Sequence, residues 1–260
     1  MAPRLPRLPW VAPLYVGAVQ LGAHAAARLP RGRRTELLRR HSTNVANLRA
    51  GRWETLVTSA AFVEDPLPVP YGAGLLAALG TAEARWGAAR AVGVFAVGHI
   101  GASLLVYAGL RGRVAQGRTP PATAGGTPTP TPTLTPAPTR ALEALGDDHD
   151  PRHAATRALD ATARALDVGA SYGFNATLGA LAVTLPHRGA RTAATAGLLA
   201  LGIRPVLRRG RTFTDAGHLV AIALGVATGC VMRAAETYTY TSRAAETYAM
   251  RAAETRRRLT

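Results

Sequence analysis

Six long apolar blocks constrain the fold of this chain more than any other feature of its sequence. A helix needs about 20 residues to cross the hydrocarbon core of a bilayer, and soluble helices of that length carry a polar face at every turn. The blocks lie at about residues 10–27, 67–82, 91–110, 168–185, 192–207 and 216–232. The sequence therefore predicts an all-α, polytopic membrane protein with six transmembrane helices; the alternative is a soluble helical bundle.

The charged residues support a membrane protein over a nucleic-acid-binding one. All 31 basic residues are arginines, against 15 acidic residues, and the formal net charge is +16. The arginines fall between the apolar blocks and form no single basic face with interleaved aromatic residues. This distribution is typical of loops that flank membrane spans. We therefore expect the arginines to lie beside the lipid bilayer and not to bind nucleic acid.

Cysteine usage and acidic clusters give no sign of a metal site. Cys230 is the only cysteine, which excludes an intrachain disulfide and a thiolate cluster. Residues 146–150, GDDHD, form the only acidic cluster that contains a histidine. No second set of ligands at helical spacing accompanies it. We interpret GDDHD as a solvated loop and expect no metal and no cofactor.

Composition divides the chain into four parts. Residues 1–118 hold the first three spans and a long first loop, and residues 119–139, TPPATAGGTPTPTPTLTPAPT, form a disordered linker because alternating Thr and Pro cannot form a helix. Residues 140–232 hold an amphipathic segment and the last three spans. Residues 233–260 repeat RAAET three times and end in a basic run. This tail is either a solvated low-complexity segment or a basic helix on anionic headgroups.

The N-terminal block has some features of a signal peptide. Arg4 and Arg7 precede it, and it ends in Ala23-His24-Ala25, which is similar to a signal-peptidase site. The apolar stretch is longer than that of most signal peptides. We therefore interpret it as an uncleaved first span.

Residues 169–173, GASYG, match the G-x-S-x-G pattern of the nucleophile elbow in soluble α/β hydrolases. That elbow needs a strand directly before the serine, whereas the preceding residues, ATRALDATARALDV, have helical spacing. Only Asp215 and His218 fit the order of acid and histidine, and they lie three residues apart on one predicted helix. The soluble hydrolase interpretation fails, and Ser171 lies at the start of an apolar helix.

A serine in a membrane helix becomes a nucleophile only if a base on another helix removes its proton. Three histidines lie in apolar blocks: His24, His99 and His218. His218 begins the sixth block, where Gly217, Ala221 and Gly225 form a stripe of small residues against which another helix can pack. If the fourth block packs there, Ser171 and His218 lie at similar depth. We expect His24, His99 and Asn175 to serve packing or hydrogen bonds between helices.

These motifs together resemble the rhomboid family, the six-helix intramembrane serine proteases. Residues 169–179, GASYGFNATLG, are similar to the fourth-helix pattern of that family, and residues 217–225, GHLVAIALG, to its sixth-helix pattern, with Ala221 in place of the usual Gly. Residues 51–62 and 80–87 are similar to the stretch between the first two helices and to the end of the second. The set is similar in particular to actinobacterial rhomboid-like proteins.

The resemblance implies a fold, a mechanism and a location. Ser171 would be the nucleophile and His218 the general base of a two-residue dyad, and the backbone N–H of Ser171 would bind the oxyanion. Asp167 and Asp215 would have no triad role. The substrate would be a transmembrane segment of another protein, cut near the outer surface of the plasma membrane without cofactor or metal. The N-terminus would lie in the cytoplasm. The sequence indicates no oligomeric state.

Two departures from the family pattern support a second hypothesis. Active rhomboids usually carry a His and an Asn four residues apart on the second helix, but residues 66–79 contain neither, and Tyr71 is the only side-chain donor there. Tyr172 replaces the usual Gly after the serine and is expected beside the approaching substrate. Losing one oxyanion donor costs about 10²–10³ in rate in other hydrolases. The alternative is a catalytically silent rhomboid-like protein that binds membrane helices without cleaving them.

The arginine count opposes the orientation that the resemblance implies. The loops expected outside carry 19 arginines and the segments expected inside carry 12, whereas cytoplasmic loops usually carry the excess. Long loops translocate largely regardless of charge, and the first loop of rhomboids is partly embedded in the membrane. We keep the orientation of the family.

Overall fold

The chain is described by a computed structural model that covers residues 8–115, 167–208 and 212–259. Every regular element in these ranges is a helix, so the prediction of an all-α chain is confirmed for the part that the structure describes. The predicted linker at 119–139, the GDDHD cluster and the amphipathic segment as far as residue 166 lie outside the described residues.

Each of the six predicted blocks coincides with a helix. These are α1 (Val11–Ala27), α5 (Val69–Trp86), α6 (Ala88–Ala115), α8 (Ser171–Val183), α9 (Arg188–Val206) and α10 (Phe213–Leu259). Four short elements fold the loop between α1 and α5, namely α2 (Arg31–His41), α3 (Val45–Arg49), α4 (Thr55–Thr58) and η1 (Ser59–Ala61). The first loop is thus a folded helical unit.

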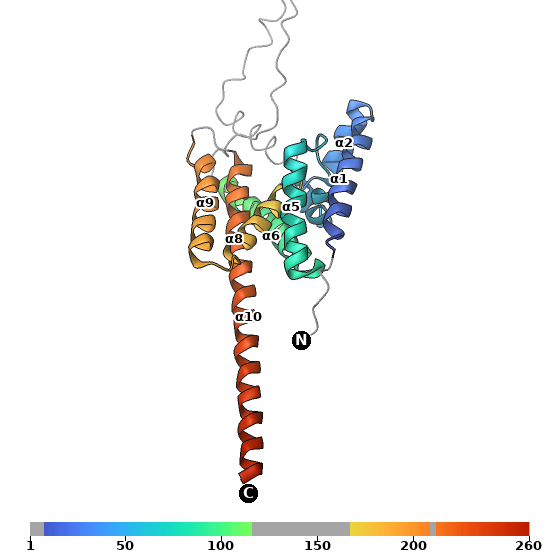
Figure 1. Cartoon of the computed structure of the whole chain (residues 1–260). Helices are drawn as coiled ribbons and strands as arrows, with labels where there is room; N and C mark the ends of the chain where they lie inside the picture. The colour runs from blue at the N-terminus through green and yellow to red at the C-terminus, as the bar shows by residue number, and fades with distance from the viewer. Residues whose placement is uncertain (1–7, 116–166, 209–211, 260) are drawn as a thin grey trace, which may run out of the picture.

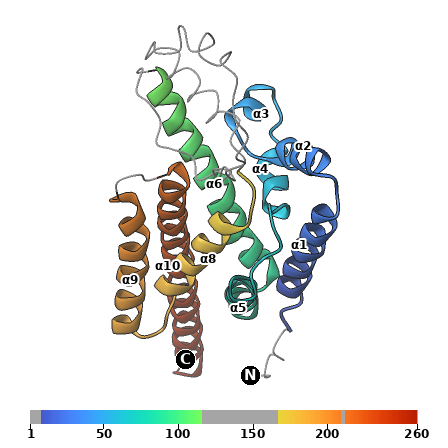
Figure 2. The same cartoon turned by 90° about the horizontal axis from the view of Figure 1, so that it is seen from above.

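Helices α1, α5, α9 and α10 run alternately up and down in Figure 1, while α6 and α8 are steeply tilted, as the view from above in Figure 2 shows. We call the end where α8 and α10 begin, at Ser171 and Phe213, the upper end, and the end where α5 stops at Trp86 the lower end. Helix α8 lies in the middle of the bundle, in contact with α5, α6, α9 and α10 (Figure 2). Because α8 and α10 both begin at the upper end, Ser171 and His218 belong to the same end of the bundle.

Helix length and composition identify two membrane-crossing candidates among the described residues. These are Ala88–Gly109, with mean hydropathy 1.8, and Phe213–Tyr248, with mean hydropathy 1.6, while Val11–Ala27 is a shorter apolar helix. Helix α8 has only 13 residues and rises about 20 Å, less than the hydrocarbon thickness of about 30 Å. The predicted count of six spans is therefore not confirmed by length and composition.

A buried carboxylate connects the first two long helices. Glu83, near the end of α5, accepts hydrogen bonds from the backbone N–H groups of Val11 at 3.1 Å and Ala12 at 2.9 Å. The first N–H groups of a helix have no partner within it and carry partial positive charge. Glu83 satisfies these donors of α1, and Gly87, with φ of 84°, then lets the chain turn into α6.

Large apolar side chains lie exposed on the outer faces of the long helices. The exposed set includes Leu14, Leu21, Val92, Leu105, Leu201 and Val231. In water such a surface is an interaction site, whereas in a bilayer it faces the lipid tails. The composition of the outer surface therefore fits the hydropathy of the sequence.

The last part of α10 leaves the bundle along its own axis (Figure 1). The RAAET repeats continue α10 as one helix to Leu259. Tyr238, Tyr240 and Tyr248 are exposed on this extension. The predicted tail is therefore a helix that projects away from the lower end of the bundle.

Small residues let α8 and α10 approach closely. Ala176 and Ala180 of α8 and Ala221 of α10 are fully buried. A Cβ added at Gly225 would collide with the backbone of Ala176, so only glycine fits at this contact. The small-residue stripe predicted on α10 thus includes the closest contact with α8.

We expect Gly225→Ala to destabilise the bundle by about 1–3 kcal/mol, because overpacking a close contact shifts backbone or side chains. Thermal unfolding in detergent micelles measures the change. Gly93→Ala is the matched control, since Gly93 is helical and open space surrounds the position of its Cβ. If both variants unfold at the wild-type temperature, the close packing of α8 on α10 is wrong.

Candidate active site

Ser171 and His218 come together across the contact between α8 and α10. Ser171 is the first residue of α8, and His218 lies in the first turns of α10. The Nε2 atom of His218 lies 3.1 Å from the Oγ of Ser171, within hydrogen-bond distance. The two residues are 47 positions apart, so the packing of α8 against α10 brings them together.

The start of α10 is fixed by a reciprocal cap. The Oδ2 atom of Asp215 accepts from the backbone N–H of Thr212 at 2.7 Å and from its hydroxyl at 2.9 Å. The backbone N–H of Asp215 in turn donates to the Thr212 hydroxyl at 3.3 Å. This is the capping-box arrangement, with an acid three residues after a threonine. The Asp215 carboxylate therefore anchors the helix that carries His218.

Tyr172 points into the bundle beside His218, and its expected place next to an approaching substrate stays a prediction. Its side chain is 2% exposed and packs edge-on against the ring of His218, with centroids 5.4 Å apart. A Cβ added at Gly217 would collide with the Tyr172 ring. Because α8 begins at Ser171, the next residue is turned by about 100° from it and faces α10. Gly217 makes the room that the ring occupies.

Asn175 forms its hydrogen bond within its own helix. Its Nδ2 donates to the carbonyl oxygen of Ser171 at 2.9 Å. The predicted contribution to hydrogen bonding between helices is therefore not observed. The bond stabilises the first turn of α8 around Ser171.

A polar clasp holds the segment that leads into α8. The clasp consists of Ser42, Thr43, Tyr107 and Asp167. The backbone N–H of Thr43 donates to the carbonyl of Asp167 at 3.1 Å, and the N–H of Asp167 donates to Ser42 Oγ at 2.7 Å. The Tyr107 hydroxyl lies 3.0 Å from Asp167 Oδ2 and also contacts the carbonyl of Thr43. The first loop and α6 thereby fix the chain four residues before Ser171.

Burial raises the pKa of Asp167 to about 6, and the hydrogen bond from Tyr107 opposes this rise. One phenolic proton serves one acceptor at a time. When Asp167 is protonated, its own O–H can bond Tyr107 while Tyr107 donates to the carbonyl of Thr43. The neutral acid therefore satisfies the whole clasp, which agrees with the direction of the pKa change.

His99 belongs to a second set of hydrogen bonds beside the clasp. It is 4% exposed, and its Nε2 lies 3.0 Å from Ser59 Oγ, which accepts from Thr43 Oγ1 at 2.8 Å. The carbonyl of Ser59 accepts from the N–H of Gly169 at 2.8 Å. His99 thus bonds a neighbouring element, as expected for a structural histidine, and His24 lies exposed on α1.

Sequence reasoning missed most of these supporting residues. Ser42, Thr43 and Tyr107 stand in no recognisable motif, and Ser59 lies in residues 51–62 without a role predicted for it. A run of small polar residues, Ser42-Thr43-Asn44, is the only signal in the first loop. Their partners lie as far as 125 positions away, so only the fold reveals them.

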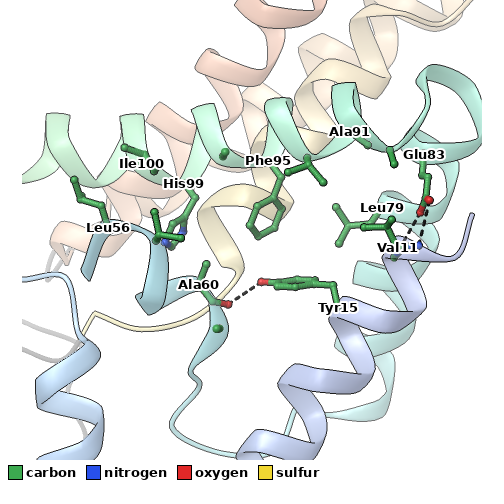
Figure 3. Close-up of a pocket in the computed structure, with 16 residues that line it drawn as sticks. Val11, Tyr15, Leu56, Ala60, Leu79, Glu83, Ala91, Phe95, His99 and Ile100 are labelled. Carbon is green, nitrogen blue, oxygen red and sulfur yellow. Dashed lines mark hydrogen bonds between the residues drawn. The ribbon is translucent and has the colours of Figure 1, made fainter. Parts of the chain in front are cut away.

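An apolar cavity of about 330 Å³ lies apart from the Ser171–His218 pair. Figure 3 shows it between α1, the α4–η1 segment, α5 and α6, with Tyr15, Phe95 and His99 on its walls. Neither Ser171 nor His218 lines it. The described residues contain no group of three or more metal-binding side chains. Among the described residues, the candidate site therefore consists of Ser171 and His218.

The second long helix presents an aromatic contact to α8. Tyr71, in the first turn of α5, packs edge-on against Phe174, with ring centroids 5.5 Å apart. Phe174 follows Ser171 by three residues on α8. Tyr71, the only side-chain hydrogen-bond donor in residues 66–79, is therefore packed on a phenylalanine of α8.

Comparison with protein families identifies a match over most of the chain. The family described as rhomboid-like protein matches residues 7–127 and 152–238, a range that includes Ser171, His218 and the clasp. Searches of curated proteins and of solved structures give no match.

We expect Tyr107→Phe to lower thermal stability by about 1–3 kcal/mol, because it removes the one hydroxyl donor that the half-buried carboxyl of Asp167 and the carbonyl of Thr43 share. The loss should grow with pH. Asp167 has a folded pKa of about 6, above its ordinary value, so its contribution to stability is complete below that ordinary value and is lost as pH rises through 6. Without Tyr107 the ionised carboxylate of Asp167 loses its hydrogen bond. The fall in stability with rising pH then extends to higher pH than in the wild type.

Unfolding temperatures between pH 4 and 7.5 measure this effect. Asp167→Asn should flatten the profile in that window, and Tyr240→Phe, on the exposed tail, is the matched tyrosine control. A Tyr107→Phe profile that runs parallel to that of the wild type would contradict the clasp.

Proposed function

The chain belongs to the rhomboid-like family, and we propose that it is an intramembrane serine endopeptidase that cleaves a transmembrane segment of another membrane protein. The observation that carries this proposal is the 3.1 Å separation of Ser171 Oγ and His218 Nε2. A hydroxyl becomes an effective nucleophile when a base lies within hydrogen-bond reach. Ser171 is the nucleophile and His218 the general base, and no cofactor or metal takes part.

In the proposed reaction, Ser171 Oγ attacks the scissile carbonyl carbon while His218 Nε2 accepts the hydroxyl proton. The tetrahedral intermediate collapses to an acyl-enzyme, and His218 donates the proton to the leaving amine. A water molecule, deprotonated by His218, then hydrolyses the ester and restores Ser171. Tyr172, packed edge-on against the imidazole, holds the ring of His218 in its orientation.

The start of α8 supplies the proposed oxyanion site. The first N–H groups of a helix have no partner within the helix and carry partial positive charge. Ser171 is the first residue of α8, so its N–H lies beside the nucleophile, as backbone donors do in other hydrolases. This arrangement provides a donor even though residues 66–79 contain neither His nor Asn.

We propose a topology of six spans in the plasma membrane, with the upper end outside. Helix α8 is too short to cross alone, and its neighbours enclose it. In this topology residues 119–139 form an outer linker between residues 1–118 and 140–232, and residues 233–260 form a cytoplasmic tail. Ser171 lies below the outer surface, where a substrate helix reaches it from the bilayer.

The alternative function is a helix-binding protein that cleaves nothing. The observation that favours it is the aromatic contact of Tyr71 with Phe174, at the helix that carries polar donors in active rhomboids. Without those donors the oxyanion has fewer partners, and each lost donor costs about 10²–10³ in rate. The two functions differ in whether Ser171 reacts.

Cleavage of a reconstituted transmembrane substrate tests the protease. We expect Ser171→Ala and His218→Ala each to reduce the rate by at least about 10³-fold, because each removes one half of a unit that acts together. The matched controls are Ser103→Ala, whose hydroxyl has no hydrogen-bond partner among the described residues, and His24→Ala on the exposed face of α1. Both controls should cleave at the wild-type rate. Cleavage that persists in Ser171→Ala would eliminate the mechanism.

Labelling with a fluorophosphonate separates a slow enzyme from a silent one. An activated serine forms a covalent adduct with this reagent, so mass spectrometry should find the adduct on Ser171 and lose it in His218→Ala. A wild-type protein that neither labels nor cleaves any of several substrates supports the helix-binding alternative.

Cysteine labelling tests the topology. In a Cys230→Ser background, we expect Thr131→Cys to react with a membrane-impermeant maleimide on intact cells. Thr247→Cys, on the tail, should react only after permeabilisation. The reverse pattern would place the upper end in the cytoplasm. Reaction of both sites on intact cells would contradict the three spans that this topology places between positions 131 and 247.

A further inference from the structure

A polar pocket of about 290 Å³ opens at the lower end of the bundle, away from the Ser171–His218 pair. Three separate parts of the chain line it: the end of α5, the turn after α8 and the tail side of α10. The lining residues are Arg85, Trp86, Thr184, Leu185, Pro186, Arg233 and Glu236. The pocket therefore forms only when these three helices are assembled.

Two guanidinium groups from different helices converge on the end of α8. Arg85 Nη2 donates to the carbonyl oxygen of Thr184 at 2.7 Å, and Arg233 Nη1 donates to the carbonyl oxygen of Val183 at 3.3 Å. These carbonyls belong to the last turn of α8, where carbonyl groups lack partners within the helix. Each guanidinium has five N–H donors, and these contacts use one from each. The remaining donors can bind a second acceptor in the pocket.

The charge balance of the pocket favours an anion. Glu236 is the only acidic residue in the lining, and its Oε1 atom pairs with Arg90 Nη1 at 3.5 Å. With Arg85, Arg90 and Arg233 around one glutamate, the local charge is positive. Planar guanidinium groups match the paired oxygen atoms of a phosphate better than an ammonium does.

The level of the pocket matches the headgroup region of a bilayer. The apolar part of α10 ends at Met232, directly before Arg233, and α5 ends at Trp86. Trp10, just before α1, belongs to the same end of the bundle and is exposed. Tryptophan is enriched where the hydrocarbon meets the headgroups. Arg85 and Arg233 thus lie where the lipid phosphates begin.

We propose that this pocket binds the phosphate group of an anionic phospholipid from the leaflet at the lower end. Basic pockets between transmembrane helices bind acidic headgroups in this way. The phosphate accepts hydrogen bonds from Arg85 and Arg233, while the acyl chains lie along the exposed apolar faces of the neighbouring helices. The bound lipid thereby ties α5, α8 and α10 together. This binding is independent of the proposed proteolysis.

Lipid titration of the purified full-length protein tests the proposal. In a neutral detergent, phosphatidylglycerol should raise the unfolding temperature and remain bound in native mass spectra, whereas phosphatidylcholine with the same acyl chains should do neither. Arg85→Gln/Arg233→Gln should weaken the apparent affinity for phosphatidylglycerol by about tenfold or more, because two charge-assisted hydrogen bonds are lost. Arg188→Gln/Arg191→Gln is the matched control, with the same charge removed at the same end outside the pocket.

Several outcomes overturn the proposal. Equal weakening in both double variants assigns the effect to surface charge in general. Inorganic phosphate that binds as tightly as the lipid, and displaces it, assigns the pocket to a free anion. If the glutamine variant does not fold, Arg85→Lys/Arg233→Lys keeps both charges and should still lose several-fold in affinity. Wild-type affinity in that lysine variant contradicts recognition by the guanidinium pair.

Discussion

The close contact between α8 and α10 is the constraint on which the rest of the structure depends. Glycine at position 225 lets the α10 backbone reach the backbone of Ala176, and this short separation brings Ser171 Oγ within 3.1 Å of His218 Nε2. Dispersion and backbone packing drive such contacts in a membrane, since lipid tails are as apolar as leucine. A larger residue at the crossing would move the imidazole away from the hydroxyl even if both side chains remained.

Close packing sets the distance between the two helices, but it does not set where α8 begins. That position comes from the polar clasp of Ser42, Thr43, Tyr107 and Asp167, together with the hydrogen bond from Gly169 to Ser59. The clasp connects the first loop, α6 and the segment before Ser171. Ser42, Thr43 and Tyr107 are buried and Asp167 is half-buried, and buried polar groups cost free energy unless each is satisfied. The upper end is therefore held by the polar clasp, whereas Glu83 and the arginine pair make the polar contacts at the lower end.

Much of this arrangement was predictable from the sequence, because it depends on local pattern. The apolar blocks gave the positions of the long helices, and the stripe at Gly217, Ala221 and Gly225 indicated the face of α10 that packs against a neighbour. The orientation of Tyr172 was not predictable, since it depends on the residue at which α8 begins, and a shift of one residue turns each side chain by about 100°. The clasp was not predictable either, because its partners are as far as 125 positions apart.

The arginines of the first loop take part in the folded structure of that loop. Arg52 donates to the carbonyl oxygen of Arg40 at 2.6 Å and lies 3.3 Å from Asn47 Oδ1, while Arg34 pairs with Asp65 at 2.7 Å. These side chains hold the folded unit of α2, α3 and α4 together. The positive-inside rule counts arginines in short loops and near the ends of spans, whatever their structural role. Arginines that form part of a folded loop are retained for its structure, so their number says little about the side of the membrane on which the loop lies.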